Sequence, residues 1–364
     1  MSYLHLMGGV RTGRLARLLR RRGLGLHPMC LARGLFLFQS SLWSSLFAFH
    51  ERRRFGRILK DAPVPADPIV IVGHWRSGST FLHQLFAQDP HLTCPTVFQC
   101  LFPDSFLVSR ARVGPLLRGL IPRQRPMDSV AVTLDAPQED EFALLRLTDA
   151  SPLEDLFYPT GPFFLTDFAE RWGERNGDPA ESPQIEEGLG HFLKKIHLQA
   201  ARRIVLKNPF HSLRMRQLLK VCPRLSFVHV YRDPLAVIPS TLRMWTVLGR
   251  MNVLKGHFHP PKLEELITVY DRVLVSIRRD LSLVPADRRC EMKFEELEAH
   301  PVETMSRTYA ALGMDFSGEF RSRLEAFLGD VRHYKKNTYT LTSEERQLIT
   351  QSLQDHRRHY GYVT

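Results

Sequence analysis

The residues between Gly73 and Thr80 have the spacing of a loop that binds a phosphate-like anion. Gly73 and Gly78 bracket the loop, the short apolar run 69–72 precedes it, and a helical pattern follows it. In a unit of strand, glycine-bounded loop and helix, the loop amides and the helix N-terminus direct their N–H groups at one spot. We therefore expect an anion site here, with these candidate contacts: Arg76, Ser77, Gly78, Ser79, Thr80 and Phe81.

The loop departs from the P-loop of nucleoside triphosphatases at one position. Its spacing is G-x-x-x-x-G-S-T, and Ser79 stands where the P-loop pattern has a lysine. That lysine neutralises the β- and γ-phosphates in triphosphate chemistry. Its absence argues against a kinase or ATPase, so a P-loop phosphotransferase is kept only as an alternative. The loop brings its cation earlier, at Arg76.

Three more polar residues follow two later strands of the expected sheet. The apolar pattern predicts strands at 203–207 and 225–230, each followed by a helical pattern. Strands joined by a helix should lie parallel, so their carboxyl ends meet at the edge that carries the first loop. Ligands bind at that edge in doubly wound sheets. Lys207 ends one strand, Arg232 follows the other, and Ser240 lies eight residues beyond Arg232.

These segments together resemble the superfamily of sulfotransferases that use 3′-phosphoadenosine 5′-phosphosulfate (PAPS). The bacterial branch distantly related to the tyrosylprotein enzymes is the most similar. The resemblance spans about residues 67–345 and is carried by four segments: 71–80, 206–210, 231–234 with Ser240, and 293–297 with the helix through Gly313. It implies an α/β fold with a P-loop-like parallel sheet of about five strands, flanked by helices and extended by helices at both ends. It also implies an enzyme that moves the sulfuryl group of PAPS to a hydroxyl or phenol.

The resemblance gives each site residue a role. Arg76 and the loop amides would hold the 5′-phosphosulfate, which suits this loop better than a magnesium-bound triphosphate. Arg232 and Ser240 would hold the 3′-phosphate, and Lys207 would pair with the sulfuryl group or the bridging oxygen. Since these cations and N–H groups supply a positive field, and no metal-ligand spacing is evident, we expect no metal to be required.

Two positions depart from the family pattern. Phe294 replaces a residue that is often tyrosine, which removes one hydroxyl on the nucleotide side. The basic, glycine-containing C-terminal loop of the cytosolic enzymes has no clear counterpart. The segment 334–337, Tyr-Lys-Lys-Asn, is either its substitute or an exposed basic turn.

Three residues are candidates for the base that takes the acceptor's proton. The acidic run 135–141 contains Pro137, which suits a first helical turn, where acids are also favoured by the helix dipole without any catalysis. Glu139 and Glu141 would project about 200° apart on one helix, so only one of them can face the acceptor. We favour Glu139, nearer the helix start. His211 is the rival, because cytosolic sulfotransferases use a histidine close to their equivalent lysine.

The positive charge is concentrated at the N-terminus. The net charge is +12, and residues 1–61 contain eleven arginines and one lysine against only Glu51 and Asp61. We therefore divide the chain into a basic, partly amphipathic helical segment, 1–61, and a sulfotransferase α/β domain, 62–364. The near-neutral domain argues against a nucleic-acid surface, which needs a basic stripe on the folded body.

The N-terminal segment contains two expected helices. Arginines recur at helical spacing from Arg11 to Arg21, and an uncharged stretch at 35–49 follows. That stretch is too short and too polar for a membrane span and has no signal-peptide cleavage pattern. It either packs on the domain, which we favour, or attaches peripherally to an anionic membrane. Five cysteines without zinc or redox spacing fit a reduced cytoplasmic protein, peripheral on the inner face of a membrane in the second case.

The acceptor is the least constrained part of the function. The segment 151–200 contains aromatic residues interrupted by prolines and glycines, which either line an apolar pocket or fill the core. We expect a small molecule, lipid or glycan with a free hydroxyl. The oligomeric state stays open. The alternative that is not an enzyme is a membrane-associated protein that binds 3′,5′-ADP without catalysis.

Overall fold

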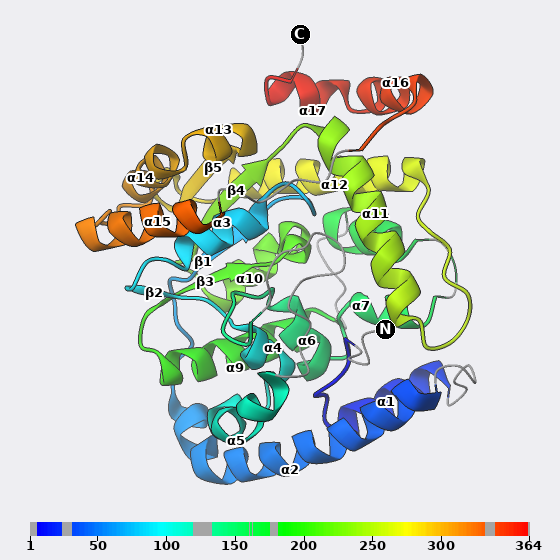
Figure 1. The fold of residues 1–364 in the computed structure, drawn as a ribbon, viewed down its shortest axis with the longest axis vertical. Coiled ribbons are helices and arrows are strands. Elements are labelled where there is room, and N and C mark those ends of the chain that lie inside the picture. The colour runs from blue at the N-terminus through cyan, green and yellow to red at the C-terminus, as the bar shows by residue number, and fades with distance from the viewer. Residues whose placement is uncertain are drawn as a thin grey trace.

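A five-stranded parallel sheet forms the centre of the molecule (Figure 1). The computed structural model describes residues 6–23, 31–118, 133–159, 161, 163–174, 181–331 and 339–362. The strand order is β2-β3-β1-β4-β5, and each neighbouring pair runs parallel. This confirms the expected fold class. The strands are β1 Ile69–Val72, β2 Leu92–Thr93, β3 Arg203–Lys207, β4 Ser226–Tyr231 and β5 Arg289–Lys293.

Helices cover both faces of this sheet (Figure 1). Before β3 they are α1 Thr12–Arg22, α2 Leu31–Asp61, α3 Ser79–Phe86, α4 Val97–Leu101, α5 Phe106–Arg118, α6 Glu141–Leu147, α7 Leu153–Phe157, α8 Phe164–Ala169, the π-helix η2 Glu170–Glu174 and α9 Ser182–Gln199. After β3 they are the 3₁₀ helix η3 Pro209–Leu213, α10 Met215–Val221, α11 Pro234–Asn252, α12 Leu263–Leu281, the 3₁₀ helix η4 Ala286–Arg288, α13 Phe294–Ala299, α14 Pro301–Ala311, α15 Gly318–Val331, α16 Ser343–Ser352 and α17 Gln354–His359.

The register of the sheet aligns the strand ends that carry the candidate residues. Strand β1 is central, with Ile71 opposite Lys207 of β3 and Val72 opposite His229 of β4. Successive residues of a strand point to opposite faces. Alternate residues of β1 accordingly enter a larger core, with α9, α10 and α12, and a smaller core, with α3, α14 and α15. Burial on both faces explains the uninterrupted apolar run at 69–72.

Helix α1 is bound to the rest of the chain by ion pairs. Arg14 is buried and pairs with Glu154 and, at 2.5 Å, with Asp149. Arg17 and Arg21 also pair with Asp149, at 2.8 and 3.3 Å. The basic stripe expected on this helix is therefore neutralised within the molecule.

Helix α2 packs on the domain, as expected, through buried residues such as Leu37 and Glu51, but the apolar stripe predicted at 35–49 faces outward and does not make this contact. Small polar residues face inward instead: Ser41 and Ser44 are buried, and Ser45 Oγ accepts a hydrogen bond from Thr12 N at 2.9 Å. Their size allows α1 to approach closely. The residues of the predicted stripe are 49–60% exposed: Leu35, Phe38, Leu42, Leu46 and Phe49.

The helix at the end of the acidic run 135–141 begins later in the sequence than expected. Pro137 forms an antiparallel bridge with Thr96, and α6 begins only at Glu141. Glu139 therefore lies in the extended approach to the helix, and the expectation that both glutamates share one helix is wrong. The cause is tertiary, because the backbone of this stretch pairs with the segment before α4.

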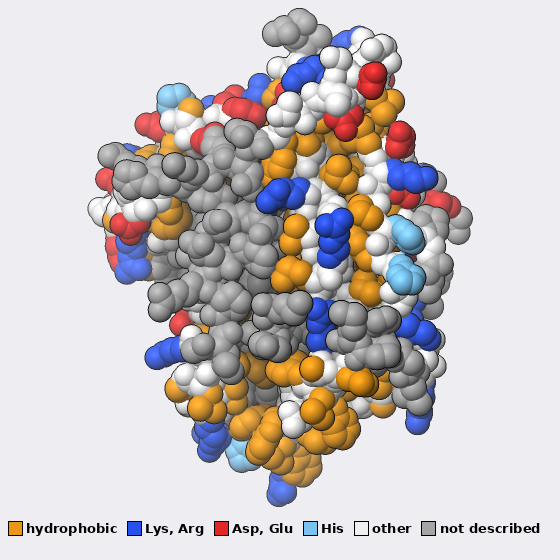
Figure 2. Space-filling view, turned by 45° about the vertical axis from the view of Figure 1, so that its right-hand side comes forward, with side chains coloured by type: hydrophobic (Ala, Val, Ile, Leu, Met, Phe, Trp, Pro, Cys, Tyr) orange, Lys and Arg blue, Asp and Glu red, His pale blue; other side chains and the backbone are white. Residues whose placement is uncertain are grey.

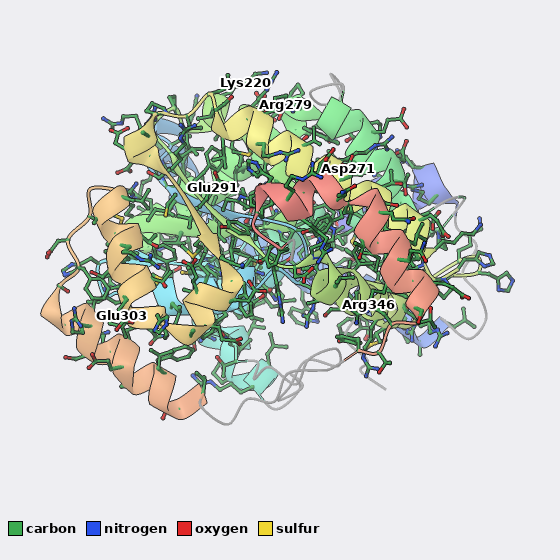
Figure 3. All side chains as sticks on the ribbon, turned by 90° about the horizontal axis from the view of Figure 1, so that it is seen from above. Lys220, Asp271, Arg279, Glu291, Glu303 and Arg346 are labelled. Atoms are coloured by element: carbon green, nitrogen blue, oxygen red, sulfur yellow. The ribbon has the colours of Figure 1, made fainter. Side chains whose placement is uncertain are left out.

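The C-terminal helices close one end of the molecule. In the view from above, α16 and α17 lie across α12, beside Asp271 (Figure 3). His356 Nε2 and Asp271 Oδ1 are 2.7 Å apart at this contact. The last turns of the chain therefore pack on the helix that borders the candidate site.

The structure also bears on the cysteines, on metal binding and on membrane spans. Cys94, Cys100, Cys222 and Cys290 are free thiols, whereas Cys30 lies outside the described residues. Within the described ranges, no cluster of histidine, cysteine and acidic residues has the arrangement of a metal site. None of the described helices is long and apolar enough to cross a bilayer.

Candidate active site at the carboxyl edge of the sheet

The loop between β1 and α3 needs its glycines for steric reasons. Gly78, the N-cap of α3, has a φ of 100°, a conformation that side chains rarely adopt. A Cβ added there would lie 2.0 Å from the ring of Phe294. Arg76 has a φ of 69°, and it is the non-glycine residue with positive φ within the described ranges. Strain of this kind is typical of ligand-binding loops.

Ser212 holds the start of the loop in place. Its hydroxyl accepts a hydrogen bond from Gly73 N at 2.9 Å and donates one to Gly73 O at 3.0 Å. Both residues are buried, and Ser212 lies in η3, directly after the strand that ends in Lys207. The loop and the end of β3 are therefore one rigid unit.

The loop region has the donors that an anion would satisfy. Ser77 Oγ and Arg232 Nε are buried and have no hydrogen-bond partner among the described residues. The first N–H groups of α3 also lack partners within their helix, as at every helix N-terminus. A buried polar group without a partner is costly, and a phosphate or sulfate oxygen removes that cost. The residues present therefore fit an anionic donor molecule.

The two expected halves of the anion site meet in space. Arg76 Nε donates a hydrogen bond to Ser240 Oγ at 2.9 Å. The Arg232 guanidinium lies 4.5 Å from the centre of the Phe294 ring, the same ring that restricts Gly78. Residues from the first loop, from the end of β4 and from α11 thus surround one region, as the motif spacing predicted.

Lys207 connects this region to a carboxylate. Its Nζ forms an ion pair with Glu139 and lies 3.3 Å from Thr80 Oγ1 at the start of α3. The Lys207 side chain is almost fully buried, whereas that of Glu139 is 20% exposed. Of the pair, Glu139 is the partner that an incoming molecule can reach.

The other candidate bases are enclosed. Glu141 is fully buried, and its carboxylate accepts hydrogen bonds from three donors: Ser151 Oγ at 2.7 Å, Asn208 Nδ2 at 2.9 Å and Arg214 Nη1 at 2.7 Å. His211 is also fully buried, with its Nε2 2.6 Å from Asp140 Oδ2. These contacts fix the start of α6 against η3 and so position Glu139.

His74 is a buried neutral residue of the loop. Burial lowers the pKa of His74 to about 4, although a hydrogen bond to the Trp75 carbonyl opposes this shift. Nδ1 donates to that carbonyl at 2.9 Å, and the ring packs 4.9 Å from the ring of Tyr270. Tyr270 in turn donates from its hydroxyl to the Arg232 carbonyl at 3.0 Å. His74 therefore supports the loop without adding charge.

Sequence reasoning missed the residues that support the site. Ser212, Arg214 and Asp140 have no motif of their own, although all three lie within a few residues of the candidates that were identified. Their roles arise from contacts between segments about 70 or more residues apart. The nearest available signal was their position beside the motif residues.

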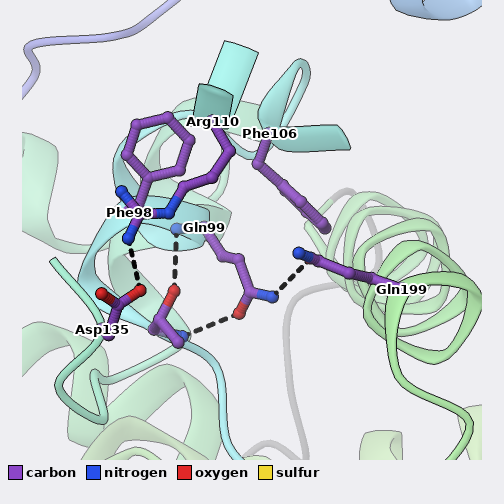
Figure 4. Close-up of a pocket in the computed structure, with 7 residues that line it drawn as sticks. Phe98, Gln99, Phe106, Arg110, Asp135 and Gln199 are labelled. Carbon is purple, nitrogen blue, oxygen red and sulfur yellow. Dashed lines mark hydrogen bonds and ion pairs between the residues drawn. The ribbon is translucent and has the colours of Figure 1, made fainter. Parts of the chain in front are cut away.

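A separate small pocket lies between α4, α5 and the end of α9 (Figure 4). It has a volume of about 60 Å³. Its polar groups bind one another: Gln99 donates to Gln199 at 3.0 Å, and Arg110 to Asp135 at 2.5 Å. A pocket of this size is too small for an acceptor molecule.

The aromatic residues of the segment 151–200 are core residues in the described part of the chain. Phe157, Tyr158, Phe163, Phe168 and Trp172 are at most 7% exposed and belong to the larger core. The segment 334–337, expected as a substitute for a basic loop, lies outside the described residues.

Comparison with known proteins identifies the family of the chain. A sequence model described as the sulfotransferase family matches residues 68–318. The omega-hydroxy-beta-dihydromenaquinone-9 sulfotransferase Stf3 of Mycobacterium bovis, and likewise that of Mycobacterium tuberculosis, is 30% identical over 322 residues. The match covers 88% of this chain and 82% of the relative.

Two solved structures share the fold. Sulfotransferase STF9 from Mycobacterium avium superposes with a TM-score of 0.69 at 18% identity, covering 95% of this chain and 90% of that one. Sulfotransferase STF1 from Mycobacterium tuberculosis gives 0.62 at 16% identity, covering 93% and 90%.

Proposed function

This chain belongs to the sulfotransferase family, and from that premise we propose that sulfuryl transfer occurs where Lys207 and Glu139 meet the loop at 73–80. The chain is a PAPS-dependent sulfotransferase. The observation that carries our assignment of the site is the ion pair between Lys207 and Glu139, beside Thr80. It places a cation and an accessible carboxylate next to a loop built for an anion.

The donor is held by residues from three segments in this proposal. Ser77, the N-terminal amides of α3 and Arg76 bind the 5′-phosphosulfate. Arg232 and Ser240 bind the 3′-phosphate. The hydrogen bond between Arg76 and Ser240 supports an additional role for Arg76, because it brings the guanidinium beside a residue that we assign to the 3′-phosphate.

Glu139 is the general base in our assignment. A base must reach the proton that it removes, and Glu139 is partly exposed whereas Glu141 and His211 are enclosed. Glu141 is also fully occupied by its three donors. The role of Asp140 and His211 is then to hold the approach to α6, so that the carboxylate of Glu139 stays beside Lys207.

The chemistry needs few further groups. Bound PAPS supplies an activated sulfuryl group with a phosphate as the leaving group. Glu139 accepts the proton of the acceptor hydroxyl, while Lys207 stabilises the negative charge that develops on the bridging oxygen. The positive field of Arg76, Lys207 and the α3 N-terminus takes the place that a metal has in triphosphate enzymes, so we propose that none is needed.

We extend the acceptor class from the relative. Stf3 is named for a hydroxylated menaquinone derivative, which is an apolar molecule with a free hydroxyl. The relative and this chain match over most of their lengths. We therefore propose a lipid-like alcohol as the acceptor, in preference to a glycan.

Incubation of the full chain with ³⁵S-labelled PAPS tests this function. Lipid and aqueous fractions of a bacterial extract are offered separately, each with and without EDTA. We expect label in the lipid fraction, unaffected by EDTA. Label confined to the aqueous fraction would overturn the acceptor class, and loss of transfer in EDTA would overturn the metal-free mechanism.

The same assay tests the base. Glu139→Gln should bind 3′,5′-ADP normally and lose transfer by at least a factor of about 100. Asp135→Asn is the matched control, because Asp135 belongs to the same acidic run and is 70% exposed. Normal turnover in Glu139→Gln would assign the proton transfer to another residue.

A further inference from the structure

The exposed face of helix α2 is the most apolar surface among the described residues. Trp43 is 64% exposed and Leu31 63%, and the exposed stripe at 35–49 belongs to the same helix. In the space-filling view, apolar side chains gather at the lower end of the molecule, where Figure 1 places α2 (Figure 2). Soluble proteins rarely expose an apolar patch of this kind unless it binds a partner.

The helix is amphipathic in the reverse sense of an ordinary surface helix. A surface helix hides its large apolar residues and exposes its polar ones. Most of the large apolar side chains of α2 face outward, whereas half of its buried positions are polar. The buried residues are Leu37, Ser41, Ser44, Ala48, Glu51 and Leu59. These large side chains therefore contribute little to the packing of the chain.

The last turns of α2 add positive charge to the same surface. Arg52, Arg53, Arg54 and Arg57 are exposed, and none has a carboxylate partner among the described residues. Glu51, the acid within this part of the helix, is buried and paired with Lys195. These arginines differ from those of α1, which the chain's own carboxylates neutralise.

We propose that α2 binds the surface of an anionic lipid bilayer, lying in the plane of the interface. Its apolar face enters the boundary between headgroups and acyl chains, and the arginines contact lipid phosphates. Trp43 has the amphipathic ring that is favoured at this depth. The helix binds the surface and does not cross it, because its apolar stretch is shorter than a span and polar residues interrupt it.

A bilayer fits this surface better than a second copy of the chain. Another copy supplies apolar area, but its α2 brings the same arginines, and Asp61 is the exposed acid on that helix. An anionic bilayer offers acyl chains and negative headgroups together. The proposal concerns a surface away from the donor site and does not depend on the identity of the acceptor.

Trp43 provides a direct measurement of binding. The other tryptophans, Trp75, Trp172 and Trp245, are at most 4% exposed, so a change in fluorescence on binding reports Trp43. The full chain is mixed with phosphatidylcholine vesicles, with or without phosphatidylglycerol, in the absence of PAPS and acceptor. We expect a blue shift, quenching by brominated lipid, and co-sedimentation with the anionic vesicles that high salt weakens.

Matched variants separate the apolar and charged contributions. Leu42→Gln/Leu46→Gln should abolish the blue shift, whereas Leu116→Gln/Leu283→Gln, at exposed positions outside α2, should not. Arg53→Gln/Arg54→Gln should weaken binding about 25-fold, at about fivefold for each charge. Arg202→Gln/Arg224→Gln removes two exposed charges elsewhere and should have little effect.

Sedimentation velocity without vesicles tests whether a second copy of the chain covers this face instead of a bilayer. We expect a monomer, and equal behaviour of the wild type and Leu42→Gln/Leu46→Gln. A dimer that this variant dissociates, together with no binding to anionic vesicles, would overturn the proposal and assign the face to a second copy. Binding that is equal on neutral and anionic vesicles would overturn the role of the arginines. Since no assay here measures sulfuryl transfer, these outcomes are independent of the proposed catalytic site.

Discussion

Arg76 and Ser240 are 164 residues apart in the chain, and Arg76 Nε donates a hydrogen bond to Ser240 Oγ at 2.9 Å. The first residue belongs to the loop after β1 and the second to α11, which follows β4. Since β1 and β4 are neighbours in parallel register, the segments that leave them start side by side. The sheet thus brings two motifs together where we propose that the donor binds.

The contribution of Arg232 to this site can be measured directly. Arg232→Ala should remove the preference for 3′,5′-ADP over 5′-AMP, because its buried Nε has no partner among the described residues and is available to the 3′-phosphate. Loss of a hydrogen bond to a charged group costs about 1.5–3 kcal/mol, or roughly 10- to 150-fold in affinity. Calorimetric titration with both nucleotides measures it. Arg243→Ala, an exposed residue of α11, is the control, and an unchanged preference in Arg232→Ala contradicts the assignment.

Gly78→Ala should damage the donor site through contact with Phe294. The added Cβ would lie 2.0 Å from the ring, and the φ of 100° is strained for alanine. We expect a loss of stability of about 1–3 kcal/mol and weak binding of 3′,5′-ADP. Phe294→Leu in the same chain should restore part of both, as urea unfolding and calorimetry would show. If the second substitution restores nothing, the backbone strain alone accounts for the effect.

The same substitution should lower the unfolding free energy far more at Glu141 than at Glu139. Glu141→Gln leaves Arg214 buried without its charge partner, and breaking such a pair costs about 3–5 kcal/mol of unfolding free energy. Glu139→Gln should cost less, because its carboxylate is partly exposed and the glutamine oxygen can still accept a hydrogen bond from the buried Lys207 Nζ, which also lies 3.3 Å from Thr80 Oγ1. Urea unfolding of both variants tests the contrast. Equal destabilisation would show that Glu139 is also a structural residue.

Acid should weaken the fold through His74. The pKa of His74 in the folded chain is lowered to about 4, below its ordinary value, so the unfolded chain binds a proton first as the pH falls. Neutral His74 makes its full contribution to the unfolding free energy above about pH 6.5, and this contribution is lost as the pH falls from about 6.5 to about 4. The loss at pH 5 is roughly 2 kcal/mol.

His74→Asn isolates this contribution. The asparagine amide keeps a donor for the Trp75 carbonyl but does not titrate in this range. The unfolding free energy should therefore fall further between pH 7 and pH 5 for the wild type than for the variant. An equal loss in both would assign the acid sensitivity to other groups.

Local sequence patterns predicted three of the five strands and placed the helix starts less well. The strands at 69–72 and 203–207 are confirmed at both ends, because glycine and charged residues bound each apolar run. The helical pattern after the strand at 203–207 becomes an α-helix only at Met215, since the Asn208 side chain first accepts a hydrogen bond from Phe210 N and starts a 3₁₀ turn. The late start of α6 has its cause in the pairing of Pro137 with Thr96.

The sequence by itself determined the class of protein, the loop at 73–80 and the order of the polar strand ends. These depend on contacts within a few residues, and on parallel connections that bring strand ends to one edge. Only the tertiary structure decided which acid is accessible and which face of α2 is exposed. Glu139 and Glu141 have the same side chain two positions apart, and the contacts of Arg214, Ser151 and Asn208 distinguish them. An apolar stripe alone does not reveal its partner, because burial depends on what the rest of the chain places beside it.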